Sequence, residues 1–395
     1  QRNQADNDLR EQAEILSLVY SFSISTPEVG DHELELLGSI AGHSHAQLFK
    51  SVNKLAERHI VQMRGRWRAI LPHAIANKLA ASALNNIRVD QLRAVFEGAG
   101  RQRLLMSFAH RLGLLHDHPV AREIVEVWLH PDGLLGRLSD LDEMSLRILD
   151  YIAPVAPEAL LDRIEAELTS PEFNGTHPRY TSQRSTIFNL LRSLAYEPIA
   201  FDRCVRLLIR ATDDEEENNN SNSVRAKVTK FFQPYLSGTH ASVAQRIAVM
   251  NECFSSDDVG RKSLGFKMLS SALSGPSWTG IEISEFGARP RNYGSQPNHN
   301  ELVVWRSAFI DVAVKLASSG DSELEGPARM TLANAFRGIW HHEAMKEKLV
   351  DAFRELNAYH PFGEGWKAVR STIYFDYIKR QDEENFQPLP EALAM

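Results

Sequence analysis

The sequence has little that would cross-link it or carry it across a membrane. Its 395 residues include two cysteines, Cys204 and Cys253, which are too few for a disulfide framework. Both lie in apolar helical patterns, where we expect a buried free thiol in a reducing compartment. No run approaches the roughly 18 apolar residues of a membrane span, and no signal-peptide pattern is present. We therefore expect a cytoplasmic protein that does not associate with membranes.

The familiar catalytic motifs are also missing. The sequence has no G-x-x-x-x-G-K-[ST] phosphate loop, no H-E-x-x-H, no C-x-x-C and no G-x-S-x-G. Its paired histidines, at 43/45, 116/118 and 341/342, have no third ligand at a spacing that suits zinc. We expect no catalytic residues, no metal site and no cofactor. An enzyme with an unrecognised site stays an alternative.

What is present begins with a compact module over residues 1–85. An apolar helix face is predicted over residues 11–22, a short helix opens near His32, and Ser44 is the expected N-cap of a third helix. Two β-prone runs, 60–64 and 67–71, then flank Gly65, which suits a hairpin turn. A fourth helix should follow Pro72. Its inward residues are expected to be Ile75, Leu79 and Leu84.

Three helices followed by a hairpin is the order of a winged helix, a fold that often binds DNA. The hairpin region carries four basic side chains and no acid between residues 58 and 70: Arg58, Arg64, Arg66 and Arg68. These arginines could contact phosphates or pair with acidic protein partners. The formal net charge of −7 disfavours a general binder of polyanions, so a nucleic-acid role is the less favoured alternative.

Residues 86–395 show helix after helix, with short Pro- or Gly-bearing breaks. The breaks at Ala153, Ala195 and Ser237 are each 42 residues apart. That spacing falls in the window of roughly 40–47 residues that is typical of HEAT and armadillo repeats, while TPR-like pairs stay open. We therefore predict a mostly all-α protein, in which a winged-helix module with a small β-hairpin precedes an α-solenoid of HEAT- or TPR-like helix pairs.

A long loop is predicted over residues 275–300, where helical periodicity is weak. Long loops in compact domains are often functional, and this one is rich in aromatic and arginine side chains that favour binding surfaces. Its candidate partner-binding residues are Trp278, Phe286, Arg289, Arg291 and Tyr293. The alternative is an ordered insertion that only covers the apolar ends of two helices.

The order of these features resembles the C-terminal half of STAND-type signalling NTPases, the bacterial relatives of NOD-like receptors. The resemblance rests on the block from Leu48 to Leu84, with the runs L-A-E-R-H-I-V-Q at 55–62, G-R-W at 65–67 and L-P-H-A-I-A at 71–76. It implies a P-loop ATPase upstream of Gln1, a winged-helix relay and a superhelical sensor. Because this chain lacks the Walker motifs, no ATPase residue is carried over.

Three functions follow from these patterns. The leading hypothesis is a non-catalytic region that binds a protein ligand, foreign or phage-derived in many family members, and relays binding to the upstream NTPase module in signalling or antiviral defence. The second is a DNA-binding transcriptional regulator with a helical ligand-sensing domain. The third is the enzyme with an unrecognised site.

Overall fold

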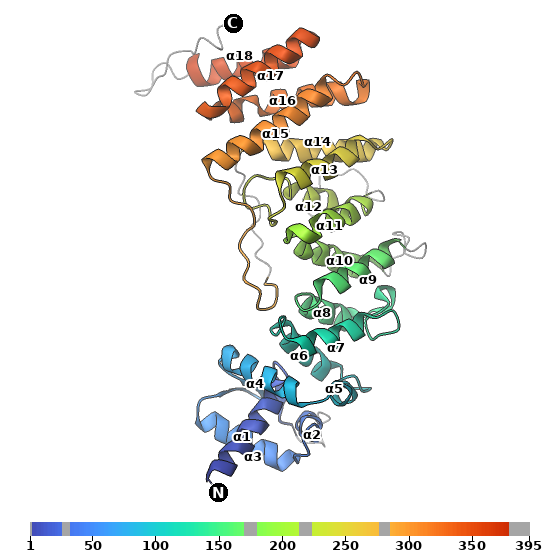
Figure 1. Cartoon of the computed structure of the whole chain (residues 1–395), viewed down its shortest axis with the longest axis vertical. Coiled ribbons are helices and arrows are strands. Elements are labelled where there is room, and N and C mark those ends of the chain that lie inside the picture. Colours follow the sequence, from blue (N-terminus) through green and yellow to red (C-terminus); the bar gives the residue numbers. More distant parts are fainter. Residues whose placement is uncertain (1, 26–31, 170–179, 213–222, 276–284, 379–395) are drawn as a thin grey trace. The chain divides into compact units, whose positions relative to one another are not determined.

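The computed structural model describes residues 2–25, 32–169, 180–212, 223–275 and 285–378 (Figure 1). The chain divides into two compact units. The first is Gln1–Leu190 with Ser284–Arg291, and the second is Leu191–Ile283 with Asn292–Met395. The predicted fold class is confirmed, because the described residues are mostly helical and hold one small sheet of three strands.

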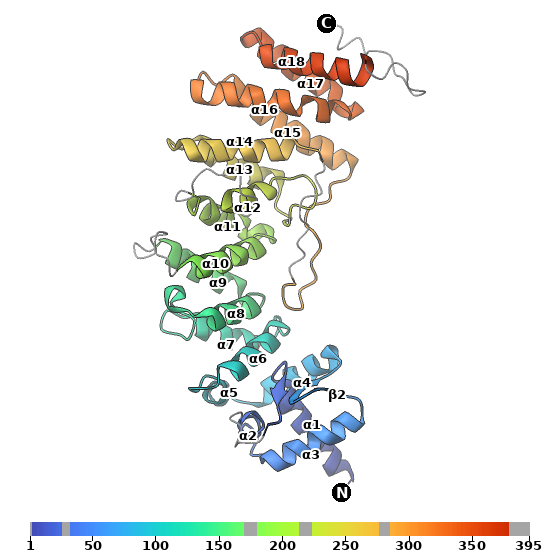
Figure 2. The same cartoon turned by 180° about the vertical axis from the view of Figure 1, so that it is seen from behind.

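The first unit opens with the predicted order of helices and hairpin, which Figure 2 shows around the N-terminus. Its elements are α1 (Arg2–Ser17), β1 (Phe22–Ser23), α2 (Glu33–Ser39), α3 (His45–Glu57), β2 (Val61–Arg64), β3 (Trp67–Ile70) and α4 (His73–Asn86). The strands are antiparallel in the order β1-β3-β2. The Ser44 hydroxyl accepts from the Gln47 amide in a capping box, as predicted. Gly65 turns the hairpin with a φ of +55°.

Two details of this module differ from the prediction. The helix expected over 11–22 ends at Ser17, because Phe22 pairs instead with Arg68 as part of β1. A two-residue strand is too short to show a period of its own. In α4, Leu84 is buried as predicted and Leu79 is half-buried, but Ile75 is exposed. The buried face also includes Ala76, Ala80 and Ala83. Alanines allow α4 to pack closely against α1, which it contacts along its length.

The rest of the first unit is helical. Its helices are α5 (Val89–Phe96), α6 (Gln102–Gly113), α7 (Pro119–Leu129), α8 (Glu143–Ile152) and α9 (Pro157–Thr169), and α10 (Tyr180–Leu194) contains the boundary between the units. Helix α6 packs on α8, α7 packs on α9, and α4 contacts α7. The boundary predicted near residue 85 therefore lies inside one compact unit, and the winged-helix elements share a core with the helices that follow.

The second unit is a regular succession of helices. They are α11 (Pro198–Arg210), α12 (Val224–Lys230), α13 (Val243–Phe254), α14 (Val259–Leu273), α15 (His299–Ala317), α16 (Ser322–Trp340), α17 (Lys346–Tyr359) and α18 (Gly363–Ile373), with a π-helical turn at Tyr374–Ile378. From α11 to α16, each helix packs against the next helix or the next but one, and mostly against both. This sequential packing fits the predicted helical repeat.

The predicted breaks fall between helices, at 153–156, 195–197 and 231–242. Cys204 and Cys253 are buried free thiols, as expected from their apolar stripes. None of the helices in the described part of the chain combines the length and the apolar character needed to cross a membrane.

Candidate functional sites

The four arginines of the predicted basic patch have different surroundings. Arg58 lies 3.5 Å from the carboxylate of Asp6 on α1. Arg68 donates to the carbonyl oxygens of Gly65 and Trp67, at 2.6 and 2.8 Å. Arg64 and Arg66 are exposed at the hairpin turn. The structure therefore places all four near the hairpin, where Arg68 bonds to the hairpin backbone and Arg58 pairs with α1 at the surface.

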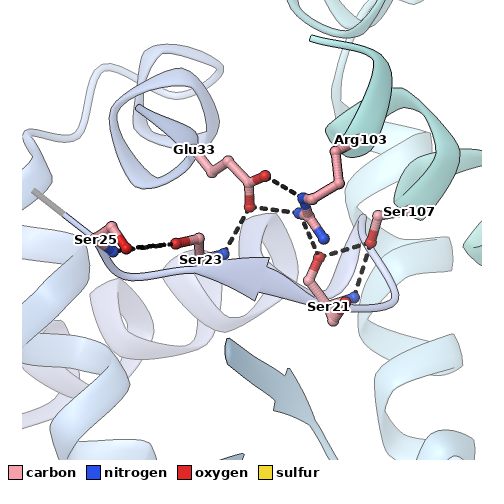
Figure 3. Close-up of polar contacts among 6 residues, drawn as sticks. All are labelled: Ser21, Ser23, Ser25, Glu33, Arg103 and Ser107. Atoms are coloured by element: carbon pink, nitrogen blue, oxygen red, sulfur yellow. Dashed lines mark hydrogen bonds and ion pairs between the residues drawn. The ribbon is translucent and has the colours of Figure 1, made fainter. Parts of the chain in front are cut away.

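A buried ion pair fastens the winged-helix module to the helices that follow (Figure 3). Glu33, at the start of α2, is almost fully buried and accepts from the Ser23 amide of β1 at 2.6 Å. Its two carboxylate oxygens pair with Nε and Nη2 of Arg103 on α6. Nη2 of Arg103 also donates to the Ser21 carbonyl at 3.0 Å. One guanidinium thus ties α6 to both β1 and α2.

A second helix contact reinforces this junction. The hydroxyl of Ser107, one turn further along α6, donates to the Ser21 carbonyl at 2.6 Å and accepts from the Ser21 amide at 2.9 Å. The Arg103 guanidinium also lies 4.7 Å from the ring centre of Trp67 on β3. Neither Glu33 nor Arg103 stands out in the sequence, because buried pairs between distant elements leave no local pattern.

Four rings stack beside this junction. The Tyr20 ring lies 5.1 Å from His73 and 3.8 Å from His110, and His110 lies 4.2 Å from Tyr151. Burial, with smaller contributions from Arg111 and His73, lowers the pKa of His110 to about 4. The pKa of His73 is lowered by burial and by Arg111. The stack joins the segment after α1 to α4, α6 and α8, with its histidines neutral near pH 7.

The predicted partner-binding loop is shared between the units. Its first described part, 285–291, packs on the first unit. Phe286 is buried, and Nε of Arg289 donates to the Pro154 carbonyl at 3.0 Å. Gly287 has a φ of +59°, and a Cβ there would meet the Gly113 carbonyl oxygen at 2.2 Å. Arg291 lies 3.7 Å from the ring centre of Phe286. Trp278 is outside the described residues.

The second part of the loop, 292–297, belongs to the second unit and pairs with the turn before α13. The amides of Leu236 and Gly238 donate to the carbonyls of Ser295 and Tyr293, at 2.9 and 3.0 Å. The Ser295 amide donates to the Thr239 carbonyl at 2.9 Å. Tyr293 therefore contributes its backbone to a short ladder, and its half-buried side chain lies beside that ladder.

This ladder forms one wall of a cavity of about 460 Å³. The other walls come from the starts of α13 and α15. The lining includes these polar and aromatic residues: His240, Ser242, Arg246, Asn292, Gln296, Glu301 and Trp305. At the rim, Nε2 of His240 lies 2.9 Å from Oδ1 of Asn292 and 3.1 Å from the Tyr196 hydroxyl.

Arg246 is the buried cation of this cavity. Its guanidinium donates to neutral acceptors: the carbonyls of Phe231, Ala241 and Thr239, and the Ser237 hydroxyl. It also lies 4.7 Å from the ring centre of Trp305. Burial lowers its pKa to about 9. No carboxylate of the described residues forms an ion pair with it, so its charge is balanced only by dipoles.

Arg246 was not predicted as a site residue, because its contacts are with the irregular segment before its helix and leave no local pattern. Within the described residues, no group of three or more His, Cys, Asp or Glu side chains could hold a metal ion. Comparison with protein-family models, with curated proteins and with solved structures finds no match for this chain.

The Glu33–Arg103 junction predicts a large effect for Glu33→Gln. The change leaves the Arg103 guanidinium partly buried without its counter-ion, so we expect a loss of about 3–5 kcal/mol in unfolding free energy. The matched control is Glu143→Gln, which removes an exposed pair with Arg147 and should change stability by less than about 0.5 kcal/mol. Urea unfolding followed by circular dichroism measures both, and equal effects would contradict the assigned role.

The ring stack predicts a stability that depends on pH. The pKa of His110 is about 4 in the folded chain, against 6.5 ordinarily, so the unfolded chain binds the proton first as pH falls. The contribution of neutral His110 to the free energy of unfolding is therefore complete above pH 6.5. It declines by up to about 3 kcal/mol as the pH falls towards 4. His110→Phe keeps a stacked ring and should reduce the decline in thermal midpoints between pH 4 and 7, leaving the part that His73 contributes. The exposed control His130→Phe should leave it unchanged.

Proposed function

We propose that this chain is a non-catalytic protein-binding region, in which the helical array receives a protein ligand and the winged-helix module passes the binding event to a further module. The observation that carries the proposal is the cavity of the second unit, whose lining includes Arg246 and Trp305. A small number of directed polar groups around an apolar surface is typical of recognition sites. The site's aromatic and arginine side chains are those enriched at binding hot spots.

The charge of the cavity favours an acidic side chain from the ligand. Arg246 is buried among neutral acceptors, and a desolvated cation gains most from a carboxylate that reaches it. The Glu301 carboxylate also lines the cavity, but it accepts from the Asn298 amide at 2.8 Å and so is engaged at the start of α15.

The relay part of the proposal rests on the Glu33–Arg103 junction. Because Glu33 and Arg103 form this ion pair, the winged-helix module either moves together with α6 or separates from it at a cost of several kcal/mol. Two such discrete arrangements are what a relay needs, since a ligand shifts an equilibrium only by its differential affinity for two states. The resemblance to STAND-type NTPases supplies the identity of the further module, an upstream ATPase, and the signalling or antiviral setting.

The cavity predicts that Gln296→Glu weakens ligand binding. This exposed residue lines the cavity, so an added negative charge there should repel the incoming carboxylate and reduce affinity about tenfold or more. A photo-crosslinking amino acid at position 296 would first capture the ligand from host extract, with the same label at the exposed Ile199 as the background. Calorimetry with the captured ligand then measures the affinity.

The matched control is Asn300→Asp, which adds the same charge in the first turn of α15 but outside the cavity lining. It should change affinity less than about threefold. A ligand that binds both variants alike would contradict the cavity as its site. Crosslinking at position 296 that does not exceed the background at Ile199 would contradict protein binding at this face.

The exposure of Arg64 and Arg66 favours DNA binding as the second candidate function. It predicts an affinity for duplex DNA that falls with salt, with a slope of about 0.9 per phosphate contacted. Neutralising Arg64, Arg66 and Arg68 to Gln should remove up to three such contacts, while Gln296→Glu should leave DNA binding unchanged. Fluorescence anisotropy across a salt series measures this, and a chain that shows no affinity at low salt excludes the DNA-binding function.

A further inference from the structure

Helix α15 carries a buried arginine that does not line the cavity. Arg306 is 1% exposed, and its Nε and Nη1 atoms have no hydrogen-bond partner among the described residues. Buried polar groups normally have partners, and a guanidinium keeps its charge at neutral pH. A buried cation with unpaired donors is costly to the fold, so an acceptor from outside the chain would stabilise it.

Two other buried arginines of this unit show the ordinary structural use of the side chain. Arg246 donates to backbone carbonyls of the segment before α13. Nη2 of Arg329, on α16, donates to the carbonyls of His360 and Pro361, at 3.0 and 2.6 Å. Each guanidinium supplies donors that irregular backbone requires. The Nε and Nη1 donors of Arg306 bond to no backbone in the described part of the chain, so support of the backbone does not account for them.

The groups around Arg306 are basic or phenolic. Burial lowers the pKa of Arg306, and the Tyr235 hydroxyl group partly offsets that effect. The pKa of His342, in the turn after α16, is lowered first by burial and then by the charge of Arg306, with smaller effects from two nearby histidines. These are His299 at the start of α15 and His341. No carboxylate of the described residues raises the pKa of Arg306, so this cluster has donors and positive charge without a matching acid.

Arg306 itself is buried, but the groups around it reach the surface. His342 and Tyr235 are half-buried. The exposed His341 faces a different group, since its Nε2 lies 3.5 Å from the Asp376 carboxylate. A ligand that reaches Arg306 from the side of His342 and Tyr235 would displace surface side chains rather than the helical core. Such a ligand has to be small.

We propose that Arg306, together with His342 and Tyr235, binds a small oxyanion of the phosphate type. Phosphate oxygens would accept from the unpaired guanidinium donors, whose planar arrangement suits them. The imidazole and the phenol hydroxyl add donors of their own. A doubly charged oxyanion balances an arginine and a protonated histidine together, whereas a carboxylate balances only one of them. The site is separate from the cavity, whose lining includes none of these three residues.

The thermal midpoint of the whole chain tests the proposal, measured with inorganic phosphate or with chloride at equal ionic strength. A ligand that binds only the folded chain raises the midpoint, and we expect a rise of about 2–5 °C at saturating phosphate. Arg306→Met should abolish this rise. Without phosphate the variant should melt no lower than the wild type, because removal of an unpaired buried charge leaves no partner behind. The second result separates a lost ligand from a damaged fold.

Further variants locate the site. Arg329→Met removes a buried arginine that bonds to backbone, so it should lower the midpoint but keep the rise with phosphate. Gln296→Glu alters the cavity and should also keep the rise, so failure of one site is distinguishable from failure of the other. His342→Gln removes one of the proposed ligand groups and should weaken phosphate binding in calorimetry by about threefold or more.

Two other probes define the class of ligand. Acetate should raise the midpoint less than phosphate does, and an equal rise would contradict a site for doubly charged oxyanions. Adenosine monophosphate that binds as tightly as phosphate assigns the site to phosphate esters, and weaker binding assigns it to free phosphate. A wild-type midpoint that phosphate does not raise above its value in chloride, or a rise that persists in Arg306→Met, overturns the proposal.

Discussion

The ion pair between Glu33 and Arg103 is the constraint on which the first unit depends. The Glu33 carboxylate, at the start of α2, accepts from β1 and pairs with Arg103 on α6. Arg103 in turn donates to the carbonyl just before β1. A buried carboxylate is tolerated only when its oxygens are fully hydrogen-bonded, and here the Ser23 amide and the Arg103 guanidinium supply those bonds. The winged helix is consequently part of the helical core and cannot be treated as a separate domain on a linker.

In the second unit a different arginine, Arg246, hydrogen-bonds buried groups that have no partner in a helix or a sheet. Arg246 binds the carbonyls of the irregular segment between α12 and α13, where no helix or sheet satisfies them. Buried backbone acceptors need such partners, and a guanidinium offers five donors in a planar fork. Because every acceptor is neutral, the charge is left without a counter-ion. The fold thereby holds a buried cation among neutral acceptors at a joint between helices.

The sequence predicted the features that depend on local chemistry. The Ser44 cap, the Gly65 turn, the helix breaks and the apolar stripes around Cys204 and Cys253 each follow from residues close together in the chain. It did not predict β1, the Glu33–Arg103 pair or the cavity beside Arg246, since each depends on residues that are distant in sequence. For a related reason the prediction for α4 was correct at Leu84 but wrong at Ile75, and it missed the alanines. Because α4 packs closely on α1, the small alanines occupy the buried face and the larger Ile75 is left exposed.

The cavity wall is held in place before any ligand arrives. Gly294 has a φ of +86°, and a Cβ there would lie 2.5 Å from the Thr239 amide nitrogen, so the two backbones are in direct contact. Three backbone hydrogen bonds join the same segments, and the cap of α15 follows at Asn298. Ordering a flexible loop costs about 1 kcal/mol or more of conformational entropy per residue. In this chain the wall is already ordered in the folded state. The backbone that forms this wall is therefore fixed by the fold itself.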